Sequence, residues 1–159
     1  MRTSLSILLL VIGLAGGPEG CGLFAPATYD ISKYQSVHEV ALDGDLGKLK
    51  ALLEVNPQLV NVSDYDKNTP LHLAAVHNHA DAVGLILDNG ANMNAQNSSG
   101  MTPLHLAAKQ GFIDVVRVIL SRGPDLNIQD SRGWTPLIWA EKTHHEEIAH
   151  LLRESGAHS

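Results

Sequence analysis

Nine histidines are the residues of this chain best suited to chemistry, because imidazole binds metals and exchanges protons near neutral pH. A zinc or copper site needs several Cys or His ligands at characteristic spacings. His77 and His79 are two residues apart, but no Cys/His set has zinc-site spacing. We therefore predict no metal site and no cofactor. A His-rich metal-binding protein stays as the alternative, which elemental analysis after dialysis would test.

A nucleophilic site has weaker support. Ser131, His144 and Asp130 contain the three side-chain types of a hydrolytic triad, but any serine-containing turn offers the same set. The chain has no Gly-rich phosphate loop and no G-x-S-x-G elbow. We therefore expect no enzymatic activity.

The charge excludes another class of function. The formal net charge is −6 and no stretch is basic, whereas nucleic-acid phosphates need clustered Lys and Arg. We expect no nucleic-acid partner. Aromatic residues make up only 4% of the chain, so the core must consist of Leu, Ile, Val and Ala.

The elements that hold these side chains are repeated. Residues 102–108 read T-P-L-H-L-A-A, residues 69–75 have the same letters, and residues 135–140 are a degraded copy. Thr69, Thr102 and Thr135, which open the three copies, are evenly spaced along the chain. The threonine is a typical helix N-cap, and proline is favoured at the first helical position. The repeat therefore predicts a short helix in every copy.

A second amphipathic run follows shortly after the first helix in each copy. In one copy its apolar positions are Val115, Val116, Ile119 and Leu120. Gly90, Gly123 and Gly156 then have the position of C-cap glycines. Polar turns follow, carrying Gly100 or Gly133 before the next threonine. Each unit is therefore a turn, a short helix, a turn, a second helix and a loop.

This unit resembles the ankyrin repeat. The resemblance rests on T-P-L-H-L-A-A, on the glycine after the second helix and on the D/N-x-x-G-x-T turn, and it covers about residues 36–158. It implies an all-α solenoid of helix-turn-helix units joined by β-hairpin-like loops. We expect four repeats, at about residues 36–63, 64–96, 97–129 and 130–158. A stack of three or more is stable.

Several positions depart from the family pattern. Lys67 stands where the family has a glycine with left-handed backbone, a conformation that costs lysine roughly 1 kcal/mol relative to glycine. Asn78 stands where Gly111 stands in the next repeat, and His144 also replaces a turn glycine. Glu141 replaces a buried alanine, which suits a terminal repeat that faces water.

The resemblance also assigns roles to histidines. His72 and His105 belong to the T-P-L-H motif, where the family uses the imidazole to brace turns by hydrogen bonds. His79 and His145 occupy a position where ankyrin repeats commonly have histidine.

In the ankyrin family the turns and first helices form a concave face that binds other proteins. Carried over to this sequence, the variable positions of that face are the predicted contact residues. They are Tyr65, Asp66, Asn68, Val76, His77, Ser98, Ser99, Met101, Lys109, Gln110, Ser131, Arg132, Trp134, Lys142 and Thr143.

Tyr65, Met101, Arg132 and Trp134 are the residue types that make hot spots or adaptable contacts. Trp134 is the expected anchor. The alternative is that Trp134 folds back on Trp139 or on its own helix, and we expect Trp139 itself to pack.

Residues 1–20 have the order of a secretory signal peptide. Arg2 gives a positive start, an apolar run extends from Leu5 to Leu14, and small residues and Pro18 follow. The run is about half of the ~20 residues that a membrane-spanning helix needs. We therefore predict a cleaved export signal over this segment.

Cys21 is the only cysteine and excludes an intrachain disulfide. Its position resembles that of the acylated cysteine of a bacterial lipoprotein signal, which implies lipidation at Cys21 and a tether over residues 21–35. The alternative is cleavage after Ala15, Gly16 or Gly17, leaving a soluble protein. We expect a periplasmic monomer that contacts the membrane only through a lipid on Cys21.

The expected function is binding of another protein. Two sharper alternatives are an inhibitor or immunity protein against a toxin or enzyme, and a scaffold for an exported enzyme. A neighbouring gene for a toxin or enzyme would separate them. A eukaryotic secreted protein is a weaker interpretation, since the sequons at Asn61 and Asn97 are triplets that often arise by chance.

Overall fold

A computed structural model describes residues 36–158 of the protein. These residues contain eight α-helices and one short 3₁₀ helix and no β-strand, so the predicted all-α fold is confirmed. The helices are α1 (Val37–Asp43), α2 (Leu46–Val55), η2 (Pro57–Asn61), α3 (Pro70–Val76), α4 (Ala80–Asp88), α5 (Pro103–Gln110), α6 (Ile113–Leu120), α7 (Pro136–Lys142) and α8 (Glu146–Glu154). The predicted signal peptide and tether, with Cys21, lie outside the described residues.

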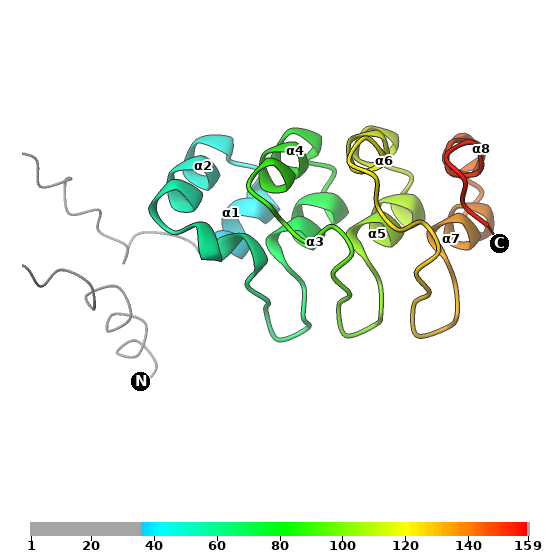
Figure 1. The fold of residues 1–159 in the computed structure, drawn as a ribbon, viewed down its shortest axis with the longest axis horizontal. Coiled ribbons are helices and arrows are strands. Elements are labelled where there is room, and N and C mark those ends of the chain that lie inside the picture. The colour runs from blue at the N-terminus through cyan, green and yellow to red at the C-terminus, as the bar shows by residue number, and fades with distance from the viewer. Residues whose placement is uncertain (1–35, 159) are drawn as a thin grey trace, which may run out of the picture. The chain divides into compact units, whose positions relative to one another are not determined.

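The helices form two rows within residues 36–158. Figure 1 shows α1, α3, α5 and α7 side by side as an inner row, with α2, α4, α6 and α8 as an outer row. Each inner helix contacts the next, and α4 contacts both α2 and α6. The fold is therefore a stack of four helix-turn-helix units.

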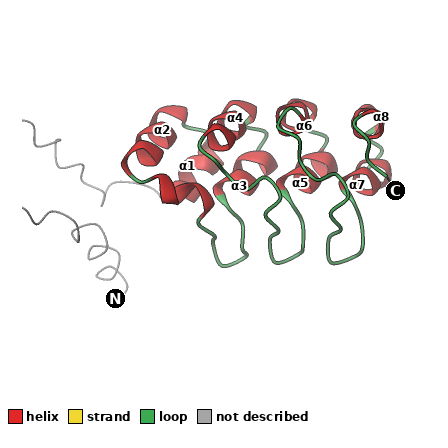
Figure 2. Cartoon of the chain, in the orientation of Figure 1, coloured by secondary structure: helices red, strands yellow, loops and turns green. Residues whose placement is uncertain are grey.

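Three loops extend beyond the inner row, and Figure 2 shows that they contain no strand. We call residues 64–68, 97–101 and 130–134 the three fingers. The expected loops are therefore present without regular β pairing. We call the fingers together with the exposed side of the inner row the finger face.

The inner helices begin as their sequence predicts. Thr102 precedes α5, and its hydroxyl accepts a hydrogen bond from the backbone N–H of His105. Pro103 occupies the first helical position, where its missing N–H costs nothing. Gly111 ends α5 in a left-handed conformation with φ 83°.

The core lies between the two rows. Paired alanines such as Ala107 and Ala108 are fully buried, and their small size lets neighbouring inner helices approach closely. Leu104 points into the same core from the same helix, and Val116 and Ile119 of α6 close it from the outer row. Leu, Ile, Val and Ala therefore build the core, as the composition requires.

Three residues other than glycine have the left-handed backbone conformation that the family pattern predicts. Lys67, Asn78 and His144 have φ of 59°, 61° and 60°. Asn tolerates this region better than most residues, whereas a lysine there is strained. The family pattern therefore predicts backbone conformation even where the glycine itself has been replaced.

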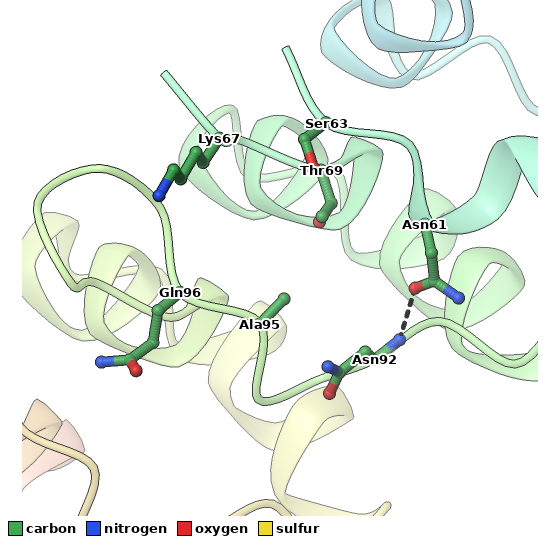
Figure 3. A pocket seen from close by; sticks show the side chains of 7 residues that line it. All are labelled: Asn61, Ser63, Lys67, Thr69, Asn92, Ala95 and Gln96. Atoms are coloured by element: carbon green, nitrogen blue, oxygen red, sulfur yellow. Dashed lines mark hydrogen bonds between the residues drawn. The ribbon is translucent and has the colours of Figure 1, made fainter. Parts of the chain in front are cut away.

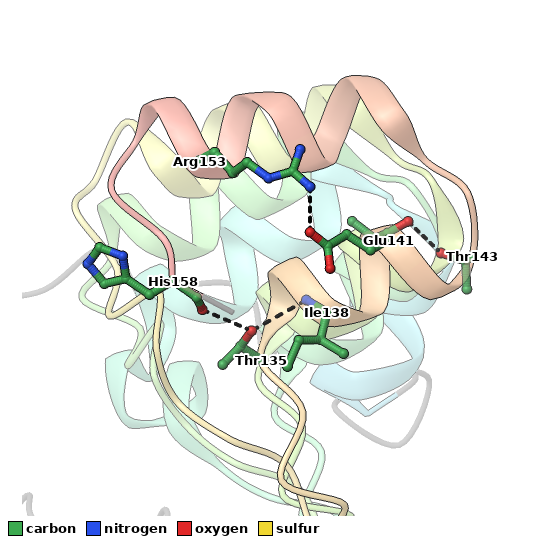
Figure 4. A network of polar contacts seen from close by, with 7 residues as sticks. Thr135, Ile138, Glu141, Thr143, Arg153 and His158 are labelled. Carbon is green, nitrogen blue, oxygen red and sulfur yellow. Dashed lines mark hydrogen bonds and ion pairs between the residues drawn. The ribbon is translucent and has the colours of Figure 1, made fainter.

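The last repeat ends the stack with polar contacts, which Figure 4 shows. Glu141 replaces a buried alanine and forms an ion pair with Arg153 of α8. The hydroxyl of Thr135 accepts from the backbone N–H of Ile138 at 3.4 Å and donates to the carbonyl of His158 at 3.5 Å. The charge of Glu141 is thus partly exposed and paired.

Within residues 36–158, none of the helices combines the length and the hydrophobicity needed to cross a membrane.

Candidate protein-binding face

Histidines of the inner row hold each finger to the preceding repeat. Nε2 of His72 donates to the carbonyl of Met101 at 3.0 Å, and Nε2 of His105 donates to the carbonyl of Trp134 at 3.0 Å. His38 makes the same contact to the carbonyl of Asn68 at 3.2 Å. The predicted bracing role of His72 and His105 is therefore confirmed, and His38 extends it to the first repeat.

The role of His38 was not predicted from the sequence. The first repeat lacks the T-P-L-H motif, and its loop is one residue longer than the others. His38 therefore lies one position further from His72 than His72 lies from His105. The contacts themselves span 30 residues for His38 and 29 for His72, which agrees with one extra residue.

The same bonds determine the charge state of these rings. The backbone N–H of Thr69 donates to Nδ1 of His72 at 3.1 Å, and Thr102 does the same to His105. Nδ1 must therefore be unprotonated while Nε2 carries the hydrogen, which makes the ring neutral. Burial lowers the pKa of His72 and His105 below 6.5, against the opposing effect of their bonds to carbonyl oxygens.

Asparagines form a second series of hydrogen bonds between repeats, which we call the asparagine ladder. Oδ1 of Asn61 accepts from the backbone N–H of Asn92 at 2.8 Å, and Oδ1 of Asn94 accepts from Asp125 at 3.1 Å. Oδ1 of Asn127 accepts from His158 at 3.0 Å. Asn61, Asn94 and Asn127 recur at the same interval as the threonines of the motif, so the repeat period itself is the signal for this ladder.

The first residue of each finger shapes its turn. Oδ1 of Asp130 accepts from the backbone N–H groups of Arg132 and Trp134, and its Oδ2 accepts from the indole of Trp139 at 2.8 Å. Burial alone would raise the pKa of the Asp130 carboxyl, but these hydrogen bonds outweigh it and lower the pKa below 3.8. Asp130 therefore stays charged although it is only 7% exposed.

Asp64 and Asn97 open the other two fingers in the same way. Oδ1 of Asp64 accepts from the backbone N–H groups of Asp66 and Asn68, and these bonds lower the Asp64 pKa against the opposing effect of burial. Oδ1 of Asn97 accepts from the N–H groups of Ser99 and Met101. All three fingers are therefore preformed turns.

An aromatic and cationic cluster lies at the third finger. The rings of Trp134 and Trp139 meet edge to face with centroids 4.9 Å apart. The Arg132 guanidinium lies 5.5 Å from the Trp134 ring and 5.4 Å from the Trp139 ring. Nζ of Lys109 lies 4.5 Å from the Trp139 ring. These distances are those of cation–π contacts.

The cluster resolves the alternatives for the tryptophans. Trp139 is 6% exposed and packs as expected, and Trp134 folds against it and is half-buried. The packing alternative for Trp134 therefore holds, and its remaining exposed surface is the part available to a partner.

Most of the predicted contact residues are exposed on the finger face. Tyr65 has an exposed fraction of 106%, which is full exposure at the tip of the first finger. Val76, Lys109 and Thr143 are half-buried, as is Asn68, whose amide oxygen accepts from Asn97. The other exposed members are Asp66, His77, Ser98, Ser99, Gln110, Ser131, Arg132 and Lys142.

The burial of Met101 corrects its predicted role as a contact residue. The sequence predicts an adaptable contact at this position, but Met101 is only 7% exposed. Its backbone carbonyl accepts from the buried His72 and its N–H donates to Asn97, so the residue is part of the base of the second finger. Asn68 and Trp134 occupy the same position and are also partly covered.

The candidate triad is not assembled. Both carboxylate oxygens of Asp130 are used by the third finger, and Ser131 donates its backbone N–H to the carbonyl of Ser99. His144 lies in the turn between α7 and α8, and no hydrogen bond joins it to Ser131 or Asp130 within residues 36–158.

Within residues 36–158 the histidines do not gather into groups of three or more possible metal ligands. The rings of His77 and His79 stack 6.4 Å apart, and Nε2 of His79 donates to the carbonyl of Leu42 at 2.8 Å. Among the described residues, no group of three or more His, Cys, Asp or Glu side chains could hold a metal ion.

A surface hollow lies between the first and second fingers and the loops beside them, and Figure 3 shows its lining. It measures about 460 Å³ and is open and polar. Lys67 and Gln96 line it together with the bonded pair Asn61 and Asn92. It lacks the enclosed apolar wall that small-molecule sites usually have.

Comparison with known proteins identifies the family. The family model "Ankyrin repeats (3 copies)" matches residues 19–97, 37–130 and 85–159. Together these matches cover most of the chain, so the chain belongs to the ankyrin-repeat family. Ankyrin repeats typically form non-catalytic protein–protein interaction modules.

Three curated relatives illustrate the similarity. The chain is 46% identical over 56 residues to the serine/threonine-protein kinase VIK of Arabidopsis thaliana, covering 35% of this chain and 13% of the kinase. It is 44% identical over 61 residues to the probable E3 ubiquitin-protein ligase XBOS32 of rice, covering 38% and 12%. It is 36% identical over 69 residues to protein fem-1 homolog C of Bos taurus, covering 43% and 10%.

The chain therefore matches only about a tenth of the length of these relatives. The matched segments carry the ankyrin similarity, and the kinase and ligase activities are those of the whole relatives.

Proposed function

We propose that this chain is an exported, monomeric, non-catalytic module that binds a partner protein with its finger face. The observation that carries the proposal is the contrast between a rigid base and a varied surface. The inner helices and finger bases are buried and hydrogen-bonded in each repeat, while the exposed finger positions carry different side chains.

The second position of the fingers illustrates this contrast. It is Tyr65 in the first finger, Ser98 in the second and Ser131 in the third, and all three are exposed. Tyr65 is fully exposed in the isolated chain. Tyrosine is enriched among binding hot spots, so its exposure on a preformed turn favours partner contact.

A site-specific crosslinking experiment tests this face. The photoreactive residue p-benzoylphenylalanine would replace Tyr65 in one full-length variant and His150, exposed on the outer helix α8, in a matched control. We expect a discrete crosslinked partner in the source cell from position 65 and none from position 150. Crosslinking of the same proteins from both positions, or only from position 150, would refute the proposed face.

Within this proposal an inhibitor and a scaffold would have different effects on the activity of the partner. An inhibitor or immunity protein would abolish the activity of a toxin or enzyme, whereas a scaffold would preserve or raise it. An assay of the crosslinked partner with and without the purified chain decides between them.

We further propose that the protein is directed to a bacterial periplasm and anchored through a lipid on Cys21. The support is sequence alone: a positive start, a short apolar run that ends at Leu14, and a single cysteine shortly after it at position 21. One acyl chain anchors only marginally, so stable anchoring needs more than one.

Labelling with radioactive palmitate tests the anchor. We expect label in the native chain and none in the Cys21→Ser variant. Equal labelling of both, or no label in either, would favour the alternative of a soluble product cleaved after Ala15, Gly16 or Gly17.

A further inference from the structure

The basic side chains of the described residues divide into two groups. Of the 11 lysines and arginines in the chain, all but Arg2 and Lys33 lie in residues 36–158. The group that has a carboxylate within 4.0 Å lies on or directly after the outer helices and comprises Lys48, Lys50, Arg117, Arg122 and Arg153. The group without one, within residues 36–158, lies on the finger face and comprises Lys67, Lys109, Arg132 and Lys142.

The charge at equivalent positions of the fingers changes from negative to positive along the stack. The third finger position is Asp66, then Ser99, then Arg132, and all three are exposed. The position at the end of the inner helices is Val76 in α3, but it is Lys109 in α5 and Lys142 in α7. Since these positions are structurally equivalent, the finger face becomes positive toward its C-terminal half.

No acidic side chain within residues 36–158 forms an ion pair with Lys109, Arg132 or Lys142. Asp130 is buried under its finger and receives three hydrogen bonds, and Glu141 is paired with Arg153. In the N-terminal half, by contrast, exposed Glu39 and Asp43 belong to α1, and Lys67 shares its finger with Asp66. A local positive patch therefore exists on a chain whose net charge is −6.

The cluster also preorganises its cations. Arg132 lies against two indole rings, and its only hydrogen bond within residues 36–158 comes from its backbone N–H to Asp130. The guanidinium N–H groups therefore remain available for bidentate binding of a carboxylate. Because packing on the rings restricts the side chain in advance, less rotamer entropy is lost when a ligand binds.

We propose that Lys109, Arg132, Trp134 and Lys142, the basic–aromatic patch, bind an acidic segment of the partner protein rich in Asp or Glu. This proposal rests on the proposed binding function and names the chemistry of its partner. A carboxylate of the segment is held by Arg132, further acidic side chains contact Lys109 and Lys142, and an apolar neighbour contacts the exposed surface of Trp134. The segment's acidic part lies over the last two repeats.

The two tryptophans of the chain report on this patch directly, because both belong to the cluster around it. The full-length protein would be titrated with a peptide of about ten residues that alternates Glu and Gly, roughly 33 Å when extended. Tryptophan fluorescence gives the dissociation constant. The matched peptide replaces every Glu with Gln, and a single-stranded oligonucleotide serves as a second polyanion.

We expect a saturable fluorescence change with the Glu peptide that weakens as salt rises, and none with the Gln peptide. Arg132→Gln and, separately, the exposed Lys142→Gln should weaken binding by about tenfold for loss of a charge-assisted contact. Arg117→Gln, which removes a paired cation from α6, should leave binding unchanged. Circular dichroism would confirm that each variant is folded.

Three results would overturn the proposal: equal binding of the Gln peptide, unchanged affinity in both Arg132→Gln and Lys142→Gln, or tighter binding of the oligonucleotide than of the Glu peptide. The crosslinking experiment at position 65 separates this failure from a failure of the proposed function. A partner crosslinked at position 65 with no acid-dependent fluorescence change leaves the binding function intact and removes only the acidic segment.

Discussion

At the scale of single residues, the turn between the two helices of a repeat depends on the histidine of the next repeat. Gly44 lies under the ring of His79, where an added Cβ would be 2.5 Å from Nδ1. Gly111 lies under His145, where a Cβ would be 2.6 Å from Cε1. Asn78 occupies the equivalent position in the second repeat, and there the next repeat has Phe112 in place of the covering histidine. Glycine is therefore kept where an imidazole covers the turn.

This arrangement predicts a difference between two glycines with similar backbone. Gly111→Ala should reduce the free energy of unfolding by about 1 to 3 kcal/mol more than Gly123→Ala, because only Gly111 is covered by a ring. Both have positive φ, so the shared backbone cost cancels in the comparison. Urea denaturation measures the difference, and equal losses would contradict the role of His145.

Removing a bracing histidine should also lower the free energy of unfolding. His105→Ala removes the donor to the carbonyl of Trp134 and the acceptor for the N–H of Thr102 inside the core. We expect about 2 to 4 kcal/mol of destabilisation in urea, because two buried polar groups lose their partners. His150→Ala, at an exposed site on α8, should change stability by less than about 0.5 kcal/mol. Similar effects of the two changes would rule out the bracing role.

At the scale of elements, the fingers are preformed turns that differ in strain. The first finger has Lys67 at φ 59°, where the other two have Gly100 and Gly133. All three open with an Asp or Asn that accepts two backbone N–H groups, so the turn is imposed by that residue and the lysine must adopt its conformation.

Lys67→Gly should therefore stabilise the protein by roughly 1 kcal/mol, since glycine has no Cβ to oppose a left-handed backbone. Thermal unfolding followed by circular dichroism measures this gain. Lys50→Gly, at an exposed position inside α2, is the control and should destabilise by about 1 kcal/mol because glycine is a poor helix former. A loss at position 67 would show that the lysine side chain itself supports the finger.

At the scale of the whole described stack, stability depends on groups whose pKa values differ between the folded and unfolded chain. The folded pKa of His72 and His105 lies below the ordinary 6.5, so the unfolded chain takes up protons first as the pH falls. Their contribution is complete above pH 6.5 and is lost below it. The pKa of Asp64 and Asp130 lies below 3.8, so their contribution is lost only below about that pH.

We therefore expect the free energy of unfolding to fall as the pH is lowered from 6.5 toward 5, with a slope of up to about 1.4 kcal/mol per pH unit for each buried histidine. A second decline should begin below pH 4. Urea denaturation across this range measures both, and His105→Gln should flatten the first decline. Stability that rises between pH 6.5 and 5 would contradict the buried neutral imidazoles.

The repeat unit, the all-α class and the inner helices with their Thr-Pro starts could be predicted from the sequence. These features depend on residues a few positions apart, because a cap or turn is built from its own local hydrogen bonds. The family motif added the bracing role of His72 and His105.

Which side chains remain available to a partner could not be predicted from the sequence, because it depends on how the repeats pack together. In the folded chain Met101 is buried, Trp134 packs against Trp139, and Arg132 has no carboxylate partner among the described residues. His38 joins the histidine contacts between repeats although its own repeat lacks the T-P-L-H motif. The physical reason is distance along the chain. The contacts between repeats join residues about 30 positions apart, so they depend on how the repeats stack and not on any local pattern.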